Sequence, residues 1–181
     1  MRALIIYESM FGNTQQVADA VGEGLARILP ADIVEVGQAP ATVPVDVSLL
    51  VVGGPTHAFG MSRPSTRADA AGQAKAPLVT GGSGVREWLS ALESPAHTTL
   101  AASFDTHMDR PHLIAKMGSA AAPIGRRLRK LGFSDIADPQ HFWVEDTLGP
   151  LREGQLERAR DWGESLAALA IAYETETLTG R

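Results

Sequence analysis

One short segment near the start of the chain combines hydroxyl, amide and glycine residues in a pattern that can bind an anion. It runs from Glu8 to Thr14 and places Ser9, Gly12 and Asn13 between an apolar run and a helical pattern. The start of a helix offers free backbone N–H groups and the positive end of the helix dipole, and both favour a phosphate. The same residue types also suit plain turn and cap chemistry, so the segment alone leaves both interpretations open.

The segment lacks the residues that two common nucleotide-binding loops require. A nucleoside-triphosphate loop needs Lys-Ser/Thr after its last glycine, and Asn13-Thr14 stands there instead. A dinucleotide-binding fingerprint needs three spaced glycines, which are missing here. The pattern therefore predicts a phosphate cradle without a lysine.

Two histidines, His57 and His107, follow later apolar runs of the chain. Histidine titrates near neutral pH, so these side chains could supply protons to a reduced cofactor or an acceptor. As a metal pair they lack a third ligand with suitable spacing, and we predict no metal site. The chain has no cysteine, which excludes disulfides, a thiolate nucleophile and an iron–sulfur cluster. Any redox chemistry must therefore be carried by a bound organic cofactor.

Apolar runs that alternate with helical patterns must position these residues. Strands are predicted at 3–7, 33–36, 47–52, 100–104 and around 142–144. Helices are predicted at 17–28, 85–92, 124–131 and 152–173, with Ser83 as a cap, Gly132 as a C-terminal cap and Tyr173 facing inward. A further short helix at 65–73 is expected inside the long connection from Gly60 to Ser83, whose role stays open.

Five strands separated by helices predict a parallel α/β sheet with helices on both faces, a three-layer sandwich formed as one domain by residues 1–181. The second strand is polar and the fifth follows Pro139, so both suit the edges and the predicted strand order is 2-1-3-4-5. In such sheets the ligand lies at the carboxyl ends of the strands, where the order switches between the first and third. Segments 8–14, 54–66 and 104–112 should therefore meet there.

The first of these segments, Ser9-Met10-Phe11-Gly12-Asn13-Thr14, resembles the phosphate loop of the flavodoxin family, which has the form Thr/Ser-x-Thr-Gly-Asn-Thr. The resemblance implies a flavodoxin-like fold and FMN as the cofactor. It also implies that the side chains of Ser9, Asn13 and Thr14 and the backbone amides of residues 10–14 bind the phosphate. Phe11 replaces the usual hydroxyl residue and is similar to the aromatic residue in the Ser-Met-aromatic-Gly loops of flavodoxin-like quinone reductases.

The resemblance extends to the other two segments. Pro55-Thr56-His57-Ala58-Phe59-Gly60 is similar to the Pro-Thr-x-Phe-Gly element that surrounds the isoalloxazine ring in the quinone-reductase branch. It implies that Thr56 bonds the flavin edge and that Phe59 or His57 packs on the ring. The alternatives are that Phe59 fills the core of its own loop and that His57 lies on the surface.

The third segment, Asp105-Thr106-His107-Met108, lacks the tyrosine that flavodoxins often place over the ring. His107 or Met108 then takes that place, or that face of the ring is open to a substrate. The cofactor-binding residues implied by the resemblance are Ser9, Met10, Phe11, Gly12, Asn13, Thr14, Pro55, Thr56, His57, Phe59, Gly60, Asp105, Thr106 and His107.

Composition and charge narrow the class of protein. The chain has 181 residues, 44% of them hydrophobic, and no apolar run of the roughly 18 residues that a membrane span needs, so a cytoplasmic globular protein is expected. The net charge is −5, but residues 107–130 carry six Lys or Arg against one Asp. Arg126, Arg127, Arg129 and Lys130 form either a solvated helix face or a docking patch for an acidic partner or a nucleotide. Nucleic-acid binding is not expected, because no aromatic residues are interleaved with these cations.

Two functions fit these observations and a third does not. We predict an FMN-binding electron carrier that serves a redox partner protein or a small-molecule acceptor. The alternative is an FMN-dependent NAD(P)H oxidoreductase acting on quinones or similar acceptors, an enzyme that usually needs an oligomer, with a homodimer as the expected form. A signalling domain of the same strand order would need a phospho-acceptor aspartate after the third strand, where Gly53-Gly54-Pro55 stands.

Overall fold

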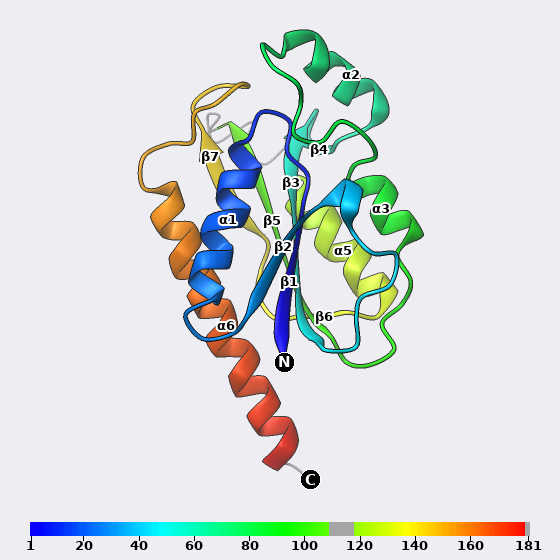
Figure 1. The fold of residues 1–181 in the computed structure, drawn as a ribbon, viewed down its shortest axis with the longest axis vertical. Coiled ribbons are helices and arrows are strands. Elements are labelled where there is room, and N and C mark those ends of the chain that lie inside the picture. The colour runs from blue at the N-terminus through cyan, green and yellow to red at the C-terminus, as the bar shows by residue number, and fades with distance from the viewer. Residues whose placement is uncertain (109–117, 180–181) are drawn as a thin grey trace.

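The computed structural model describes residues 1–108 and 118–179, and a mainly parallel sheet lies at its centre (Figure 1). Its strands pair in the order β2-β1-β3-β5-β6, with β7 also parallel to β5 and β4 antiparallel to β3. The predicted order 2-1-3-4-5 is confirmed, with the last strand divided into two pieces. The strands are β1 (Arg2–Tyr7), β2 (Ala31–Glu35), β3 (Val47–His57), β4 (Gly60–Met61), β5 (Leu100–Met108), β6 (Ser134–Asp135) and β7 (Gln140–Val144).

Helices cover both faces of the sheet (Figure 1). On one face lie α1 (Asn13–Leu25) and α6 (Gln155–Thr179), and on the other lie α3 (Val85–Ala91) and α5 (Ala121–Leu131). The helix α2 (Pro64–Gln73) confirms the predicted short helix in the long connection, and it lies beyond the carboxyl ends of the strands. A single 3₁₀ turn, Val36–Gln38, follows β2.

Alternating residues of the central strands pack into two separate hydrophobic clusters. Ile5 packs in the cluster that includes Leu166 of α6, whereas its neighbour Ile6 packs in the cluster that includes Ile124 of α5. Successive side chains of a strand point to opposite faces, so a strand covered on both sides must be apolar throughout. This explains why the runs at 3–7 and 47–52 show no polar alternation.

Helices α1 and α6 approach each other backbone to backbone near the C-terminal end of α1. A Cβ atom on Gly24 would lie 2.0 Å from the carbonyl oxygen of Arg160, and one on Gly163 would lie 2.2 Å from that of Val21. No side chain fits at either position. The two glycines therefore set the distance between the helices.

Strands β3 and β5 continue past their predicted ends at 52 and 104, to His57 and Met108. Gly53-Gly54-Pro55 was expected to close a strand, but these residues pair in register with Phe104, Asp105 and Thr106 of β5. Gly53 has a packing role, because a Cβ atom there would lie 2.1 Å from the ring of Phe104. Gly53 therefore makes room for a ring of the protein itself, and the first residues of two predicted loop segments belong to strands.

Four smaller expectations were wrong. Helix α1 ends at Leu25, and Ile28 beyond it is 44% exposed. The N-cap of α3 is Gly84, whose N–H donates to the Glu87 carboxylate, and not Ser83. Helix α6 runs on to Thr179, and Tyr173 faces outward. For α1 and α6 the local pattern was helical, but packing decided where the buried face stopped.

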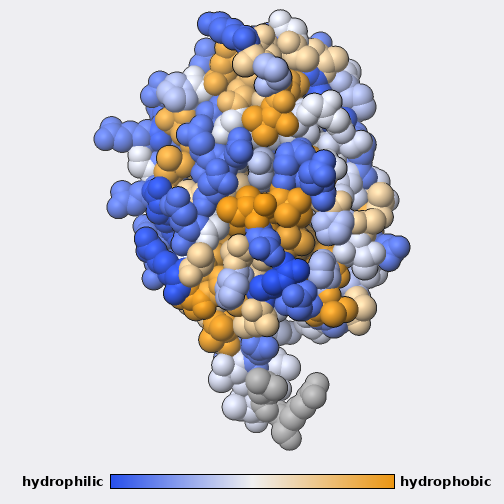
Figure 2. Space-filling view, in the orientation of Figure 1, coloured by the Kyte–Doolittle hydropathy of each residue, from blue (hydrophilic) through white to orange (hydrophobic). Residues whose placement is uncertain are grey.

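The surface of the described residues mixes polar and apolar side chains. Figure 2 shows hydrophobic residues scattered among hydrophilic ones on the face viewed in Figure 1, where the edge strand β2 lies in front. Ile33 of β2 is 38% exposed, while the neighbouring Asp32 pairs with Arg2. Within residues 1–108 and 118–179, no helix has both the length and the hydropathy that crossing a bilayer requires.

Candidate functional site

A cleft of about 390 Å³ opens at the carboxyl ends of β1, β3 and β5, where the strand order predicted a ligand site. Its volume lies within the range of about 300–1,000 Å³ that is usual for small-molecule sites. The cleft is lined by Ser9, Met10, Phe11, Asn13, Thr14, Pro55, Thr56, His57, Ala58, Phe59, Thr66, Asp69, Ala70, Gln73, Thr106, His107, Met108, Gly118, Val144 and Thr147.

One end of the cleft is the start of α1. Gly12 has a φ of 88°, a left-handed conformation that lets the loop turn sharply into the helix. The Gly12 N–H donates to the Ser9 hydroxyl at 3.1 Å, and the first intrahelical bond runs from the Gln16 N–H to the Gly12 carbonyl. The amides at positions 13–15 therefore have no carbonyl of an earlier turn to pair with, as an anion site requires.

The polar side chains of this loop are also tied into the protein. Asn13 donates from Nδ2 to the Leu148 carbonyl at 3.3 Å, and the hydroxyls of Thr14 and Thr106 lie 2.8 Å apart. All three loop residues with polar side chains, Ser9, Asn13 and Thr14, are buried. These bonds fix the orientation of the side chains while leaving the second Nδ2 hydrogen of Asn13 and the Ser9 hydroxyl hydrogen to donate.

A β-hairpin formed by β3 and β4 makes the opposite wall. Its two turn residues, Ala58 and Phe59, have φ values of 44° and 67°. Positive φ at both turn positions matches the twist of a two-residue hairpin but is strained for residues other than glycine. Phe59 is 44% exposed and lines the cleft, so the turn presents an aromatic ring beside it.

His57, at the end of β3, also lines the cleft. Burial lowers the pKa of His57, and the nearby Arg67 acts in the same direction. Thr56, one residue earlier, donates its hydroxyl to Asp105 Oδ2 at 3.0 Å and accepts the Ala120 N–H at 2.9 Å. The Thr56 hydroxyl therefore makes its hydrogen bonds to groups of the protein that surround the cleft.

Asp105 lies fully buried behind the cleft, at the point where α5 begins. Its Oδ2 atom accepts the N–H groups of Ala120 and Ala121 at 2.8 and 3.0 Å in addition to the Thr56 hydroxyl. The carboxylate thus binds the first amides of α5, as anions do at helix N-termini. Asp105 was predicted as a cofactor contact, but it does not line the cleft.

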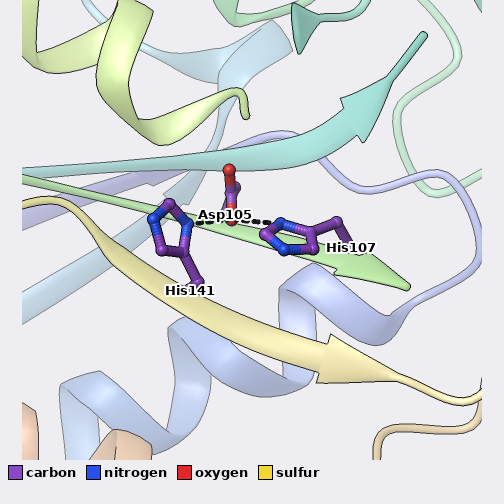
Figure 3. A group of neighbouring side chains, drawn as sticks. All are labelled: Asp105, His107 and His141. Atoms are coloured by element: carbon purple, nitrogen blue, oxygen red, sulfur yellow. Dashed lines mark hydrogen bonds and ion pairs between the residues drawn. The ribbon is translucent and has the colours of Figure 1, made fainter. Parts of the chain in front are cut away.

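The other oxygen of Asp105 holds two histidine rings (Figure 3). His107 Nδ1 lies 3.0 Å and His141 Nδ1 lies 2.9 Å from Asp105 Oδ1. Burial alone would raise the pKa of Asp105, but the hydrogen bonds from the two histidines outweigh it and hold that pKa well below its usual range. The hydrogen bond to Asp105 in turn raises the pKa of His141.

Asp105, His107 and His141 bring three potential metal-ligand atoms within 4.8 Å of one another. The sequence had suggested His57 as the partner of His107, but His57 is not in this group. The hydrogen bonds between the rings and the carboxylate account for the arrangement, since both Nδ1 atoms face an oxygen that accepts them. His141 was missed because it becomes a neighbour of Asp105 only through the register of β7 on β5.

A second buried carboxylate, Glu8, lies directly after β1 and was also missed. Its Oε2 atom accepts the Val85 N–H at 2.8 Å at the start of α3, and a Cβ atom on Gly84 would lie 2.5 Å from that oxygen. Its Oε1 atom has no hydrogen-bond partner within the described part of the chain. Burial raises the pKa of the Glu8 carboxyl.

Of the fourteen predicted cofactor contacts, eleven line the cleft and three, Gly12, Gly60 and Asp105, are not among its lining residues. Gly60 closes the hairpin opposite His57. Helix α2 forms a further wall of the cleft through Thr66, Asp69 and Gln73. Thr66 falls within the segment 54–66 that was expected at the site, whereas Asp69 and Gln73 belong to the connection whose role the sequence left open.

The basic segment lies along α5, whose first residues are at Asp105 and whose last residues are at the other end of the strands. Arg127 donates to the Arg86 carbonyl and the Ser90 hydroxyl, and Arg129 pairs with Asp135. Arg126 is exposed. These contacts favour the solvated-face interpretation over a docking patch beside the cleft. Residues 109–117 of the segment lie outside the described residues.

No protein-family model and no curated protein sequence matches this chain. Solved structures do match it. A flavodoxin from the domain Archaea has 19% identity and a TM-score of 0.63, with 94% of this chain and 99% of that chain covered. A WrbA-like flavodoxin protein from Agrobacterium tumefaciens has 17% identity and a TM-score of 0.58, with 94% and 98% covered.

A third match is to part of a larger protein. Rubredoxin:oxygen oxidoreductase from Desulfovibrio gigas has 16% identity and a TM-score of 0.62, with 94% of this chain but 36% of that chain covered. At these identities the likeness establishes the fold of this chain, which is flavodoxin-like.

Proposed function

We propose that this chain is an FMN-binding redox protein that carries electrons. The observation that supports the proposal most directly is the start of α1, where amides without intrahelical partners open into a cleft at the strand-order switch point. A phosphate bound there leaves the rest of the cleft, between the Phe59 turn and the end of β5, for a flat ring. The structural neighbours described as flavodoxins support the same cofactor.

The residues present fit FMN in chemistry as well as in volume. The phosphate would be held by the 13–15 amides and by the free donor hydrogens of Ser9 and Asn13. Apolar and aromatic side chains, among them Met10, Phe11 and Phe59, line the remainder of the cleft. Bound FMN supplies one- and two-electron transfer, which the side chains of this chain cannot perform. The protein itself binds the phosphate, orients the ring and excludes water from one side of it.

The proposal predicts strong discrimination between FMN and riboflavin, which lacks the phosphate. The test is a fluorescence titration of the cofactor-free protein with each flavin. Removal of one charge-assisted hydrogen bond costs about 1.5–3 kcal/mol, so Asn13→Ala should weaken FMN binding by about ten- to a hundred-fold and leave riboflavin binding unchanged. Ser165→Ala, an exposed hydroxyl change on α6, is the matched control and should bind FMN as the wild type does. Equal affinities for the two flavins would contradict the assignment.

An NAD(P)H oxidoreductase is the second candidate, and the face of the cleft near β5 favours it. Flavodoxins often cover the ring there with tyrosine, whereas this chain presents His107 and Met108. Hydride transfer requires the nicotinamide to stack on an accessible ring face. Rapid anaerobic mixing of the FMN-loaded protein with NADH or NADPH separates the two functions, because fast loss of flavin colour without a partner protein identifies the enzyme.

The remaining predictions concern the setting of the protein. We propose that residues 1–181 act as one domain in the cytoplasm, and that electrons pass to a partner protein or a small acceptor. If the exposed Arg126 contributes to docking of an acidic partner, Arg126→Glu slows electron exchange at low salt and not at high salt. A homodimer stays a prediction of the oxidoreductase alternative.

A further inference from the structure

Strand geometry brings Asp105, His107 and His141 together. Side chains two residues apart on a strand point to the same face, so Asp105 and His107 of β5 share one face of the sheet. The register of β7 on β5 places His141 directly opposite Asp105. The sequence predicted no metal site, because His57 and His107 lacked a third ligand of suitable spacing. The fold supplies His107 with two other partners.

The facing atoms of the three side chains have nearly the spacing of metal ligands (Figure 3). A tetrahedral ion with bonds of about 2.0–2.1 Å holds its ligand atoms about 3.3 Å apart. Asp105 Oδ1 lies 3.0 Å from His107 Nδ1 and 2.9 Å from His141 Nδ1, and all three atoms lie within 4.8 Å of one another. Both rings point at Oδ1, so a small rotation of each ring directs both Nδ1 atoms to a common point beside that oxygen.

The other bonds of Asp105 orient it as a ligand through one oxygen. Its Oδ2 atom accepts the Thr56 hydroxyl and the N–H groups of Ala120 and Ala121, which leaves Oδ1 as the atom that faces the rings. Outer hydrogen bonds of this kind orient the ligands of metal sites in proteins. The ligand oxygen is therefore in position before an ion binds.

Charge near the three side chains comes from two described residues. Asp105 supplies one negative charge, and neutral imidazole binds a metal at Nδ1 when its hydrogen is on Nε2. Arg158 of α6 donates to the His141 carbonyl and opposes the charge of a cation. Asp109 and Arg110, the next charged residues after β5, lie outside the described residues and are not assigned to the site.

The donor atoms select the class of metal. Two imidazole nitrogens and one carboxylate suit Zn²⁺ and related transition-metal ions, whereas Mg²⁺ and Ca²⁺ prefer oxygen ligands. Three protein ligands leave a position of the ion for water, as in open zinc sites. The side chains of His107 and His141 are 14% and 36% exposed, so the rings extend from the buried carboxylate to solvent and give an ion a path.

We propose that Asp105 Oδ1, His107 Nδ1 and His141 Nδ1 bind one divalent transition-metal ion, which links β5 to β7 beside the cleft. Because His107 lines the cleft, the ion also fixes the position of that ring there. The site takes no part in binding the phosphate of a flavin, so this inference goes beyond the proposed function and is tested apart from it.

The test uses the full chain as purified, without a polyhistidine tag and after dialysis against EDTA. Wild type, His107→Gln, His141→Gln and His97→Gln are titrated with ZnCl₂ in a calorimeter at about pH 7.5, above the ordinary histidine pKa. His97 lies at the amino end of the sheet, where it bonds the Val47 carbonyl, and its variant is the matched control.

Wild type and His97→Gln should bind one Zn²⁺ per chain, and excess Mg²⁺ should not displace it. Loss of an outer hydrogen bond alone weakens a metal site by about 10- to 100-fold, so His107→Gln and His141→Gln should weaken zinc binding by at least about ten-fold. Equal zinc affinity in these two variants and the wild type would overturn the inference, as would a wild type that binds no zinc.

Thermal melting provides a second readout. An ion that binds only the folded state raises the melting temperature as its concentration increases. ZnCl₂ should therefore raise the Tm of wild type and His97→Gln, and leave that of His107→Gln and His141→Gln close to its value in EDTA. A trio held by hydrogen bonds alone would show no such rise in any of the four proteins.

Histidine side-chain nitrogen NMR of the wild type keeps the inference testable if a variant fails to fold. Zinc should shift the Nδ1 resonances of His107 and His141 and leave those of His97 unchanged. Shifts at other histidines in place of these two would overturn the inference. Zinc binding at the trio without FMN binding would contradict the proposed function alone, and FMN binding without a zinc site would overturn this inference alone.

Discussion

Two buried carboxylates at the carboxyl end of the sheet behave in opposite ways. Asp105 and Glu8 are 0% and 1% exposed, so their depth is the same. Asp105 accepts five hydrogen bonds, whereas Glu8 accepts the Val85 N–H and leaves Oε1 without a partner in the described residues. The pKa of Asp105 is lowered and that of Glu8 is raised. The number of donors around a buried carboxylate, and not its depth alone, therefore decides the direction in which its pKa is shifted.

The difference also separates two roles. The charged Asp105 orients His107 at the cleft and binds the start of α5, so it connects the framework to the site. Glu8 bonds the start of α3 and does not line the cleft. Asp105 thus orients a side chain that lines the cleft, whereas Glu8 binds the start of a helix that packs beside it.

The largest effect is expected when the charge of Asp105 is removed. Asp105→Asn replaces one carboxylate oxygen by an NH2 group, although every neighbouring amide and ring donates a hydrogen bond to this side chain. Loss of one partner of a buried charge pair destabilises a folded protein by about 3–5 kcal/mol. Urea unfolding at neutral pH measures this loss. Because the folded pKa is lowered, the stabilisation is present above the unfolded pKa of 3.8 and is lost as the pH falls, so the two proteins should converge in acid.

The control for this prediction is Asp46→Asn, which removes an exposed carboxylate paired with Arg2. It should change the unfolding free energy far less than Asp105→Asn does. An Asp105→Asn protein within about 1 kcal/mol of the wild type would show that the five hydrogen bonds do not hold a buried charge.

A smaller effect of opposite pH dependence is expected at Glu8. The folded state holds the Glu8 proton more tightly than the unfolded state, so wild-type stability falls as the pH rises above the unfolded value of 4.5, until the folded pKa is passed. Glu8→Gln keeps an acceptor for the Val85 N–H and does not titrate. Relative to the wild type, its free energy of unfolding should increase by about 1–2 kcal/mol between pH 4.5 and neutral pH. This is the usual cost of one unsatisfied buried polar group.

Urea unfolding of both proteins at several pH values measures this gain. Glu153→Gln, on an exposed loop, is the matched control and should show no such trend. A constant difference between Glu8→Gln and wild type across this range would mean that Glu8 is ionised in the folded protein, and the contrast with Asp105 would disappear.

The smallest effect is expected at His141, which is partly exposed. The pKa of His141 is raised in the folded protein. Its contribution to the free energy of unfolding is therefore fully present below the unfolded pKa of 6.5 and is lost as the pH rises through the pKa of the folded state. His141→Gln should therefore be less stable than wild type at pH 5.5 by under about 1 kcal/mol, and the two should approach each other at pH 8.5. Thermal melting at the two pH values measures this. A difference that grows with pH would reverse the assigned sign.

Features that are local in the chain could be predicted from the sequence. The apolar runs, the strand order and the short helix after Met61 are confirmed, because the strands are covered on both faces and the turns between them are marked by glycine and proline. The loop from Ser9 to Thr14 was recognisable for the same reason, since its residues are consecutive and α1 begins within it.

Features that depend on pairing between distant segments could not be predicted. The length of β3 depends on its register with β5, and His141 meets Asp105 only because β7 pairs there. The hydrogen bonding of the buried Glu8 carboxyl likewise depends on α3, which starts 77 residues later in the chain. The sequence order of side chains was enough to predict a phosphate loop directly after a strand. The cluster of Asp105, His107 and His141 beside the cleft required the packed fold, because register and burial arise from contacts that no local pattern encodes.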